Sequence, residues 1–214
     1  MKIAFIGTYP PRKCGIGTFT NNLLKAVAAN TDHQDLASVA QVIAIDNNEQ
    51  DNDYPDEVIL KIRQNRQRDY VTAAKQINFS DADVCVLEHE FGIFGGDDGV
   101  YILSLIHRLN LPLIVTLHTV LDDPSYTQRS IIEEIGNRAA RIVVMSKRAV
   151  DFLTDIYNIP REKIDYIEHG VPDFNKVSPV NIKKKYNFED RKILLTFGLI
   201  SRNKGIETVI NALP

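Results

Sequence analysis

The stretch 2-KIAFIGTYPPRKCGIGTF-19 joins a short apolar run to a loop with two prolines and the pair Gly15 and Gly17, and a segment of helical periodicity follows. A glycine-containing loop after a first strand can bind a dinucleotide, hold another phosphate or a sugar, or only turn the chain. The stretch therefore predicts a strand, a loop and a helix, and it leaves the purpose of the loop open.

Short β-branched runs alternate with longer segments of helical spacing along the chain. The expected strands cover 2–7, 39–46, 57–62, 83–89, 112–118, 141–146, 164–169 and 192–198, and the expected helices cover about 17–30, 66–79, 98–110, 126–139 and 147–157. Strand followed by helix, repeated, is typical of a doubly wound parallel sheet with helices on both faces. We therefore expect a Rossmann-like α/β fold.

The alternation breaks at 170-GVPDFNKVSP-179, where two prolines, a glycine and mixed polar residues indicate an interdomain linker. We expect a first domain over 1–170, a linker over 171–190, and the first strand and helix of a second, truncated α/β domain over 191–214. One strand and one helix cannot bury a core, so the sequence is expected to be part of a longer protein. The apolar side chains of 191–214 then need other cover. Folding back on the first domain or self-association through this segment would supply it.

The composition is that of a soluble globular chain: 214 residues, 44% hydrophobic, 25% charged, with a formal net charge of −3. This mildly acidic balance argues against nucleic acid as the main ligand, and the basic run 183-KKK-185 is expected to be a solvated helix face. Cys14 and Cys85 lack metal-ligand or CxxC spacing, and no signal peptide precedes the first strand, so we expect a cytoplasmic setting. No apolar run approaches the roughly 20 residues that span a bilayer, so membrane contact would be at most peripheral.

Three of the five histidines, His89, His118 and His169, fall at the ends of expected strands, while His33 falls in a loop and His107 on a helix. Ligands of open α/β sheets bind beyond the carboxyl ends of the strands, because loops and helix N-termini converge there. A single histidine at such a place can be a hydrogen-bonded structural residue. Three together favour a functional site.

A metal site is one interpretation of these histidines, because Glu88, Glu90 or Glu168 can add carboxylate ligands. The spacing, however, matches no close-set metal motif. We therefore expect no metal and no other cofactor.

The opening loop fails as a dinucleotide fingerprint. That motif needs G-x-G-x-x-G directly after the strand, whereas Gly15, Gly17 and Thr20 give G-x-G-x-x-T and seven residues separate Gly7 from Gly15. What remains is a long, proline-stiffened loop that delivers two glycines to a helix N-terminus, where bare backbone N–H groups can approach a ligand. A turn and helix start without a ligand is the alternative.

Several motifs occur in order along the chain, namely 8-TYPPRKCGIGTF-19, 89-HEFGIFGG-96, 116-TLHT-119, 165-DYIEHGVP-172 and 198-GLISRNKG-205. Together they resemble the retaining, nucleotide-sugar-dependent glycosyltransferases of the GT-B group called group 1 or family 4. The corresponding family patterns are P-x-x-G-G, T-x-H, I-x-N-G-V and G-R-L-x-x-x-K-G, and HEFGIFGG resembles a subgroup that transfers mannose or a similar sugar. The resemblance covers the whole chain, as an N-terminal Rossmann-like domain plus the first strand and helix of the C-terminal domain.

The resemblance implies roles on the acceptor side of a cleft. His118 would lie near the transferred sugar and position a hydroxyl rather than attack, since no protein nucleophile is required in this class. Glu90 and His89 would face the same cleft and orient the acceptor or take its proton. Gly15 and Gly17 would line the cleft.

The resemblance also implies the donor side. Arg202 and Lys204 would hold the diphosphate of a nucleotide-sugar, and His169 would be a substrate-binding residue where the linker starts. The family has an arginine where this chain has Leu199, so Arg202 either takes over that role or the role is lost. The acidic E-x7-E motif of the family would lie beyond Pro214, so this chain alone is expected to be inactive. The acceptor would be a glycan, a lipid or a small molecule.

Two other classes of protein remain as alternatives. An NAD-dependent or nucleotide-sugar-modifying Rossmann enzyme would need the tight glycine-rich turn and usually a Tyr-x-x-x-Lys pair on a helix, and the sequence has no such pair. A non-catalytic flavodoxin-like module would end near 130 residues, without the linker or the basic loop that follows it.

Overall fold

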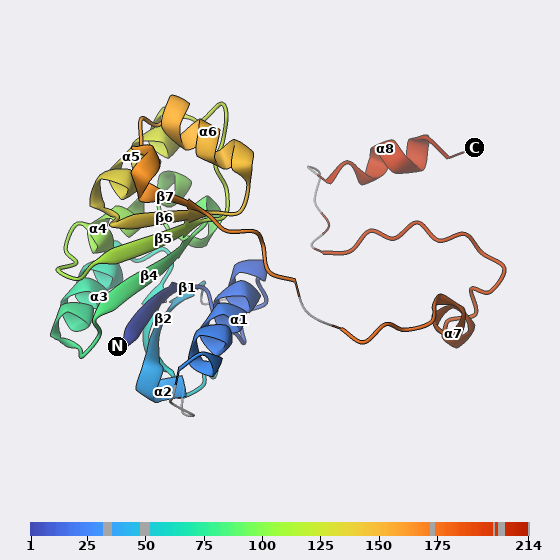
Figure 1. Cartoon of the computed structure of the whole chain (residues 1–214), viewed down its shortest axis with the longest axis horizontal. Coiled ribbons are helices and arrows are strands. Elements are labelled where there is room, and N and C mark those ends of the chain that lie inside the picture. Colours follow the sequence, from blue (N-terminus) through green and yellow to red (C-terminus); the bar gives the residue numbers. More distant parts are fainter. Residues whose placement is uncertain (32–35, 48–51, 172–173, 199, 201–203, 214) are drawn as a thin grey trace. The chain divides into compact units, whose positions relative to one another are not determined.

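The computed structural model describes residues 1–31, 36–47, 52–171, 174–198, 200 and 204–213 (Figure 1). The chain divides into two units, Met1–His169 and Gly170–Pro214. The first unit contains a β-sheet with helices, and the described part of the second contains two short helices.

The described strands of the first unit form one seven-stranded parallel sheet, in the order β3-β2-β1-β4-β5-β6-β7. The strands are β1 Ile3–Gly7, β2 Ala40–Asp46, β3 Val58–Arg63, β4 Val84–His89, β5 Leu113–Leu117, β6 Arg141–Val144 and β7 Ile164–Tyr166. Phe5 of β1 pairs with Val42 on one side and Val86 on the other. Since the strands are parallel, their carboxyl ends lie at one edge of the sheet. The predicted doubly wound sheet is confirmed.

Helices cover both faces of this sheet, with α1 on one face and α3, α4 and α5 on the other (Figure 1). The helices and 3-10 turns are α1 Gly15–Ala29, α2 Leu36–Val39, α3 Gln67–Phe79, η1 Phe91–Ile93, η2 Asp97–Ile102, α4 Leu103–Ile106, α5 Tyr126–Arg138, α6 Lys147–Asp155 and η3 Arg161–Lys163. Four of the predicted helices correspond to α1, α3, α5 and α6.

The predicted helix over 98–110 is wrong in its first half. The chain there forms the 3-10 turn η2, and α-helix begins only at Leu103. Asp98 and Gly99 have φ values of 52° and 83°, in the left-handed region that an α-helix does not contain. The helical periodicity of the sequence did not indicate this break.

Helix α5 begins at a capping box formed by Ser125 and Gln128. The Ser125 hydroxyl accepts from the Gln128 backbone N–H, and the Gln128 side chain accepts from the Ser125 backbone N–H. The Asp98 carboxylate accepts from the Ser125 hydroxyl at 3.0 Å and from the Gln128 amide at 3.2 Å. These bonds tie the loop after β4 to the loop after β5.

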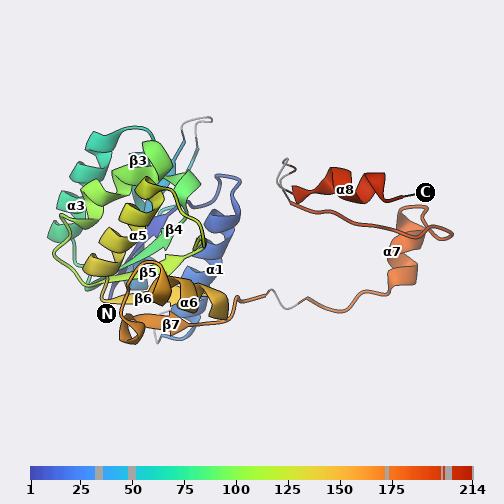
Figure 2. The same ribbon diagram turned by 90° about the horizontal axis from the view of Figure 1, so that it is seen from above.

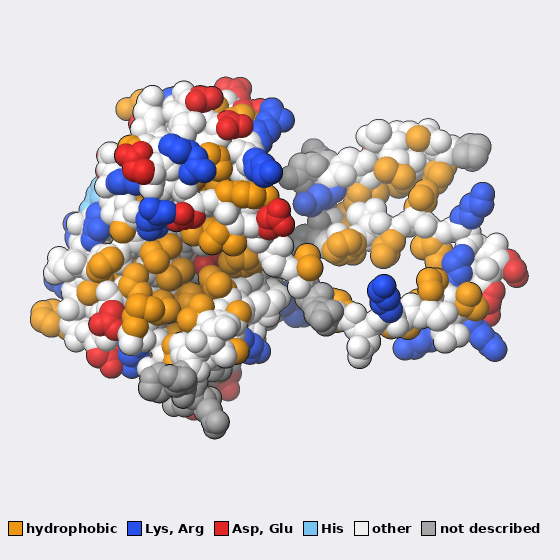
Figure 3. All heavy atoms as spheres, in the orientation of Figure 1, with side chains coloured by type: hydrophobic (Ala, Val, Ile, Leu, Met, Phe, Trp, Pro, Cys, Tyr) orange, Lys and Arg blue, Asp and Glu red, His pale blue; other side chains and the backbone are white. Residues whose placement is uncertain are grey.

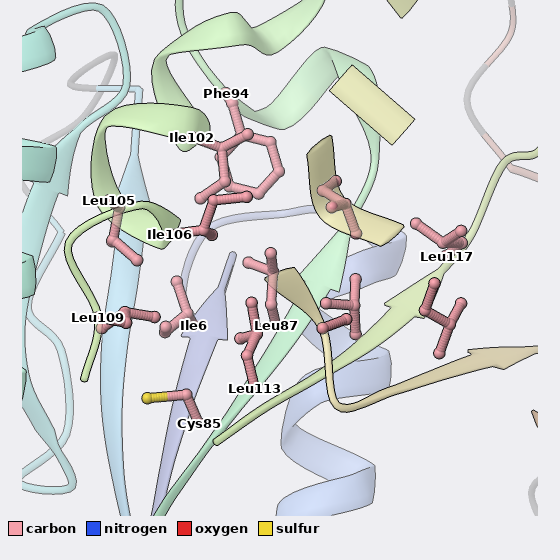
Figure 4. Close-up of a cluster of buried hydrophobic side chains, with 14 of the residues drawn as sticks. Ile6, Cys85, Leu87, Phe94, Ile102, Leu105, Ile106, Leu109, Leu113 and Leu117 are labelled. Atoms are coloured by element: carbon pink, nitrogen blue, oxygen red, sulfur yellow. The ribbon is translucent and has the colours of Figure 1, made fainter. Parts of the chain in front are cut away.

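The core lies in two layers because successive side chains of a strand point to opposite faces. The larger cluster packs strand residues such as Ile6, Leu87 and Leu113 against Ile102 and Leu105 from η2 and α4 (Figure 4). Burying each such side chain stabilises the fold by about 1.5–3 kcal/mol.

The smaller cluster lies under α1 on the other face. It contains Phe5, Val86 and Leu24, and other members such as Leu23 and Ile114 pack against it only partly buried. At the surface, Figure 3 shows hydrophobic side chains gathered on the face of the first unit that is in view. Both faces of the central strands are therefore apolar.

The second unit contains α7 Pro179–Lys185 and α8 Ile206–Asn211. The predicted strand over 192–198 is wrong: these residues form no strand, and Leu194, Leu195 and Phe197 are 71%, 78% and 89% exposed. A strand needs a neighbour for its N–H and C=O groups, and one segment alone provides none. No helix within the described ranges is long and apolar enough to cross a membrane.

The loop after β4 packs closely around Gly95. A Cβ atom added there would lie 2.1 Å from the Gln64 carbonyl oxygen and 2.8 Å from the Tyr101 ring. The same Gln64 oxygen accepts from the Tyr70 hydroxyl, which accepts in turn from the Gly95 N–H at 3.1 Å. Only glycine fits at this position.

Gly95→Ala is therefore expected to lower the free energy of unfolding by about 3 kcal/mol, the scale of an overpacked core site. Urea unfolding of the chain followed by circular dichroism measures this change. Gly92→Ala is the matched control in the same loop, because a Cβ atom there meets nothing within 4 Å. Equal losses in the two variants would contradict the packing argument.

Candidate functional site

A buried hydrogen-bonded pair of titratable side chains lies at the carboxyl ends of β4 and β5. The Nε2 atom of His118 is 2.9 Å from an oxygen of Glu88, and the two side chains are 8% and 0% exposed. The other Glu88 oxygen accepts from the Thr116 hydroxyl at 3.4 Å. The Glu88 carboxylate, which the fold removes from water, therefore has partners on the neighbouring strand.

This pairing fixes the orientation of His118. Because Nε2 is bonded to Glu88, Nδ1 is the ring nitrogen that is left for another partner. The backbone N–H of His118 donates to the carbonyl oxygen of His89 at 3.0 Å, which holds the main chain in place. His118 is thus a positioned imidazole at the sheet edge where α/β proteins bind ligands.

Helix α1 supplies an aromatic wall beside this imidazole. The ring of Phe19 lies edge-on to the ring of His118 at 4.8 Å and to the ring of His169 at 5.4 Å. His169 itself is exposed. The structure therefore brings two of the three predicted strand-end histidines into contact with one phenylalanine, which comes from the helix that follows the opening loop.

The two predicted loop glycines differ in their surroundings. Gly15 is exposed, and a Cβ atom there would meet nothing within 4 Å. Gly17 is buried, and its Cβ atom would lie 3.3 Å from the backbone nitrogen of Tyr9, so its missing side chain serves the packing of α1 on the loop. The N-cap residue Cys14 makes no side-chain cap bond. At the start of α1 the backbone is thus accessible at Gly15 and covered at Gly17.

Arg12 holds the opening loop on the sheet edge. Its guanidinium donates to the Ile45 carbonyl at 2.9 Å and to the Gln64 side-chain oxygen at 3.0 Å. Gln64 donates in turn to the Gly92 carbonyl at 3.2 Å. The loops after β1, β3 and β4 are therefore connected by hydrogen bonds around the site.

Glu90 is partly buried and joins the loops after β4 and β5. Its carboxylate accepts from the Thr119 hydroxyl at 2.6 Å. The two predicted motifs, 89–96 and 116–119, are thus connected by Thr119 as well as by His118. A role for Glu90 with an acceptor stays a prediction.

His89 does not face the cleft that was predicted for it. Its ring is fully buried on the face opposite Glu88, 5.1 Å from the Phe91 ring and 5.6 Å from the Phe94 ring. Both ring nitrogens lack a hydrogen-bond partner among the described residues. Burial, with a smaller effect of His118, lowers the pKa of His89 to about 3. The interpretation of His89 as an acceptor-contacting catalytic residue is therefore corrected: the period of two along β4 turns it into the core.

The remaining predicted residues belong to the second unit or fall outside the described part. Lys204 is described and exposed in the second unit. Arg202, Leu199 and His33 lie outside the described residues.

Sequence reasoning missed the roles of Glu88, Phe19 and Thr119. Glu88 was considered only as a metal ligand, and the signal that can find it is a carboxylate directly after the apolar run 84-VCVL-87. No group of three His, Cys, Asp or Glu residues that can hold a metal ion occurs in the described ranges. Cys85 is a buried free thiol, and burial raises its pKa to about 12.

Comparison with known families identifies the chain. The model of the family described as Glycosyltransferase Family 4 matches residues 15–173, which is well over half of the sequence. The chain belongs to glycosyltransferase family 4. The match includes the α1 start, the Glu88–His118 pair and His169.

Individual relatives agree with this assignment. An uncharacterized glycosyltransferase of Methanocaldococcus jannaschii is 22% identical in an alignment of 126 residues that covers 52% of this chain and 32% of that protein. The crystal structure of a glycosyltransferase from Rickettsia africae superposes with a TM-score of 0.53 at 17% identity, over 87% of this chain and 50% of the other. This family 4 chain therefore shares its fold with a solved glycosyltransferase and spans half or less of these relatives.

A third similarity is weaker. An alpha-glucosyltransferase in complex with UDP-glucose and DNA containing an abasic site matches 68% of this chain and 36% of its own length, with 16% identity and a TM-score of 0.45. At that TM-score the likeness carries no argument about this chain.

The buried His89 makes the stability of the family 4 domain depend on pH. His89 is neutral in the folded chain and has its ordinary pKa, about 6.5, when unfolded, so the free energy of unfolding falls as pH drops below about 6.5. At pH 5 the free energy of unfolding has fallen by about 2 kcal/mol because of His89. His89→Phe is expected to show a shallower fall between pH 7 and 4.5 in urea unfolding.

The control for this measurement is His107→Phe, because His107 is an exposed histidine paired with Glu134 at 2.9 Å. That variant should keep the steep fall of the parent chain. A slope for His89→Phe that equals the parent slope would show that His89 is not the titrating group.

Proposed function

We propose that this chain forms the acceptor-side half of a glycosyltransferase that moves a sugar from a nucleotide-sugar to a glycan, lipid or small-molecule acceptor. The observation that supports this most is the buried Glu88–His118 pair at the carboxyl ends of β4 and β5, next to Phe19 of α1, in a chain of glycosyltransferase family 4. Because the chain spans 50% of the solved Rickettsia relative, the complete activity is proposed for a protein of that length.

In this proposal His118 hydrogen-bonds the transferred sugar or the attacking hydroxyl. Glu88 holds the ring, and the Nδ1 atom is the group offered to substrate. A hydrogen bond from His118 to a sugar or acceptor hydroxyl lowers the barrier only if it is stronger in the transition state than in the ground state. The reaction proceeds with retention and without a protein nucleophile.

Glu90 is the proposed acceptor-side carboxylate. One of its carboxylate oxygens accepts a hydrogen bond from the Thr119 hydroxyl at 2.6 Å. This bond holds the carboxylate in one orientation beside the segment 116–119, which contains His118. A carboxylate held in this way can orient an acceptor hydroxyl or take its proton. Gly15 offers open backbone at the start of α1, where an acceptor or donor oxygen can approach.

On the donor side we propose Lys204, together with Arg202, for the diphosphate, and His169 for substrate contact beside Phe19. The mannose specificity, which rests on the resemblance of 89–96 to a mannose-transferring subgroup, belongs to this proposal. So do a cytoplasmic location, the absence of a metal or other cofactor, at most peripheral membrane contact, and self-association through 191–214.

His118→Ala, in a protein of full family length that contains this chain, is expected to lower turnover about 100-fold, since a positioning or proton-transfer group is lost. The measurement is the rate of nucleoside diphosphate release from a panel of nucleotide-sugars. His107→Ala is the matched control, because His107 is an exposed histidine that pairs with Glu134 and not with Glu88. Unchanged turnover in His118→Ala, with the control also unchanged, would remove His118 from the chemistry. The 214-residue chain alone should release none.

Lys204→Ala in the same full-length protein is expected to weaken nucleoside diphosphate binding by about 2 kcal/mol, or roughly 30-fold, the value of one charge-assisted contact. Titration calorimetry measures the dissociation constant. Lys192→Ala, another exposed lysine of the second unit, is the control and should bind normally. Binding of NAD in place of the nucleoside diphosphate would favour the dinucleotide-binding alternative.

A further inference from the structure

A basic groove lies at the edge of the sheet, away from the site at β4 and β5. It has a volume of about 490 Å³ and is lined by Leu60, Lys61, Arg63, Arg66, Arg68, Asp69, Thr72 and Gln76. Its walls are the outermost strand β3 and helix α3, which pack against each other (Figure 2). In the strand order, β2, β1 and β4 separate β3 from β5. The groove is therefore a separate feature from the Glu88–His118 site.

Positive charge dominates this groove. Four cationic side chains line it and Asp69 is the single acid among its lining residues. The Asp69 carboxylate is already paired, because the Arg63 guanidinium donates to it through Nε at 2.6 Å and through Nη2 at 3.0 Å. That pairing holds the pKa of Asp69 below its usual range. The negative charge of Asp69 therefore offsets the positive charge of Arg63. The positive charges of Lys61, Arg66 and Arg68 are left largely without a carboxylate to offset them.

Two of these three cations lack a close carboxylate. Lys61 donates to the Asn52 carbonyl at 3.0 Å, and Arg68 has no carboxylate partner within the described residues. Arg66 reaches Asp69 only at 3.9 Å and its side chain is 57% exposed. The guanidinium groups of Arg66 and Arg68 are thus available for an anion.

Helix α3 adds to the positive field and to the polar lining. The helix begins at Gln67, and Arg66 and Arg68 beside this residue line the groove, so the positive end of the helix dipole lies there and is partly offset by Asp69 in the first turn. Arg68, Thr72 and Gln76 follow at intervals of four residues and form one stripe on the groove wall. A planar guanidinium matches two oxygens of a phosphate group at once.

Protection of the free strand edge does not account for this arrangement. Cations on β3 itself discourage pairing with another strand, and Lys61 and Arg63 suffice for that purpose. Arg66 and Arg68 lie beyond the strand and converge on the same concavity. We propose that this groove binds a phosphate-bearing ligand, with Arg66 and Arg68 as its principal contacts and the source being either a free phosphorylated molecule or a lipid headgroup.

The test uses the 214-residue chain labelled with ¹⁵N. Titration with pyrophosphate is expected to give saturable amide shifts confined to residues 60–76. The double variant Arg66→Ala, Arg68→Ala should bind at least tenfold more weakly, since both guanidinium groups are lost. Both side chains are exposed, so the fold should persist. The control Lys184→Ala, Lys185→Ala removes the same charge from α7 and should bind normally.

A second arm distinguishes the two sources. Co-sedimentation is measured with neutral vesicles and with vesicles that contain an anionic phospholipid, at low and high salt. Binding of pyrophosphate without binding of vesicles supports a free phosphorylated ligand. Binding of anionic vesicles that the Arg66, Arg68 variant loses supports a lipid headgroup. The proposal would be overturned if the amide shifts were uniform and non-saturating and the chain also bound no vesicles. It would be overturned as well if the shifts were of that kind and the Arg66, Arg68 variant bound vesicles as well as the parent chain. So would equal losses in the α7 control. None of these readouts depends on glycosyl transfer.

Discussion

A carboxylate with no exposed surface determines how the sheet edge around the site is built. Removing the Glu88 carboxyl group from water is costly unless hydrogen-bond partners replace the water, and Thr116 of β5 and His118 directly after that strand provide them. The ends of β4 and β5 must therefore stay in register, and His118 must keep one orientation. Phe19 then covers the ring from α1.

The surrounding loops are held by similar hydrogen bonds. The Gln64 side chain accepts a hydrogen bond from Arg12 in the opening loop and donates one to the Gly92 carbonyl in the loop after β4. The backbone carbonyl of Gln64 occupies the space that a side chain at Gly95 would need. Asp98 connects that loop to the start of α5. The site is thus supported by a rigid edge rather than by a single flexible loop, which suits a role in positioning substrate.

The fold could be predicted largely from the sequence, and the site only in part. The alternation of strands and helices placed His118 and Glu90 at strand ends, and the structure brings both to the edge shared by β4 and β5. The break at Asp98 was missed because apolar periodicity carries no information about φ. The strand over 192–198 was predicted from its residues alone, although a strand also requires a neighbour.

The sequence by itself determined the fold class, because short β-branched runs separated by helical segments have few arrangements other than a parallel sheet covered by helices. Only the tertiary structure decided which face each residue of β4 takes. Both faces of that strand are buried, so 84-VCVL-87 is apolar throughout and its pattern cannot tell inside from outside. For this reason Glu88 became the partner of His118, and His89 became part of the core. The contact across 30 residues of sequence exists only once β4 and β5 lie side by side.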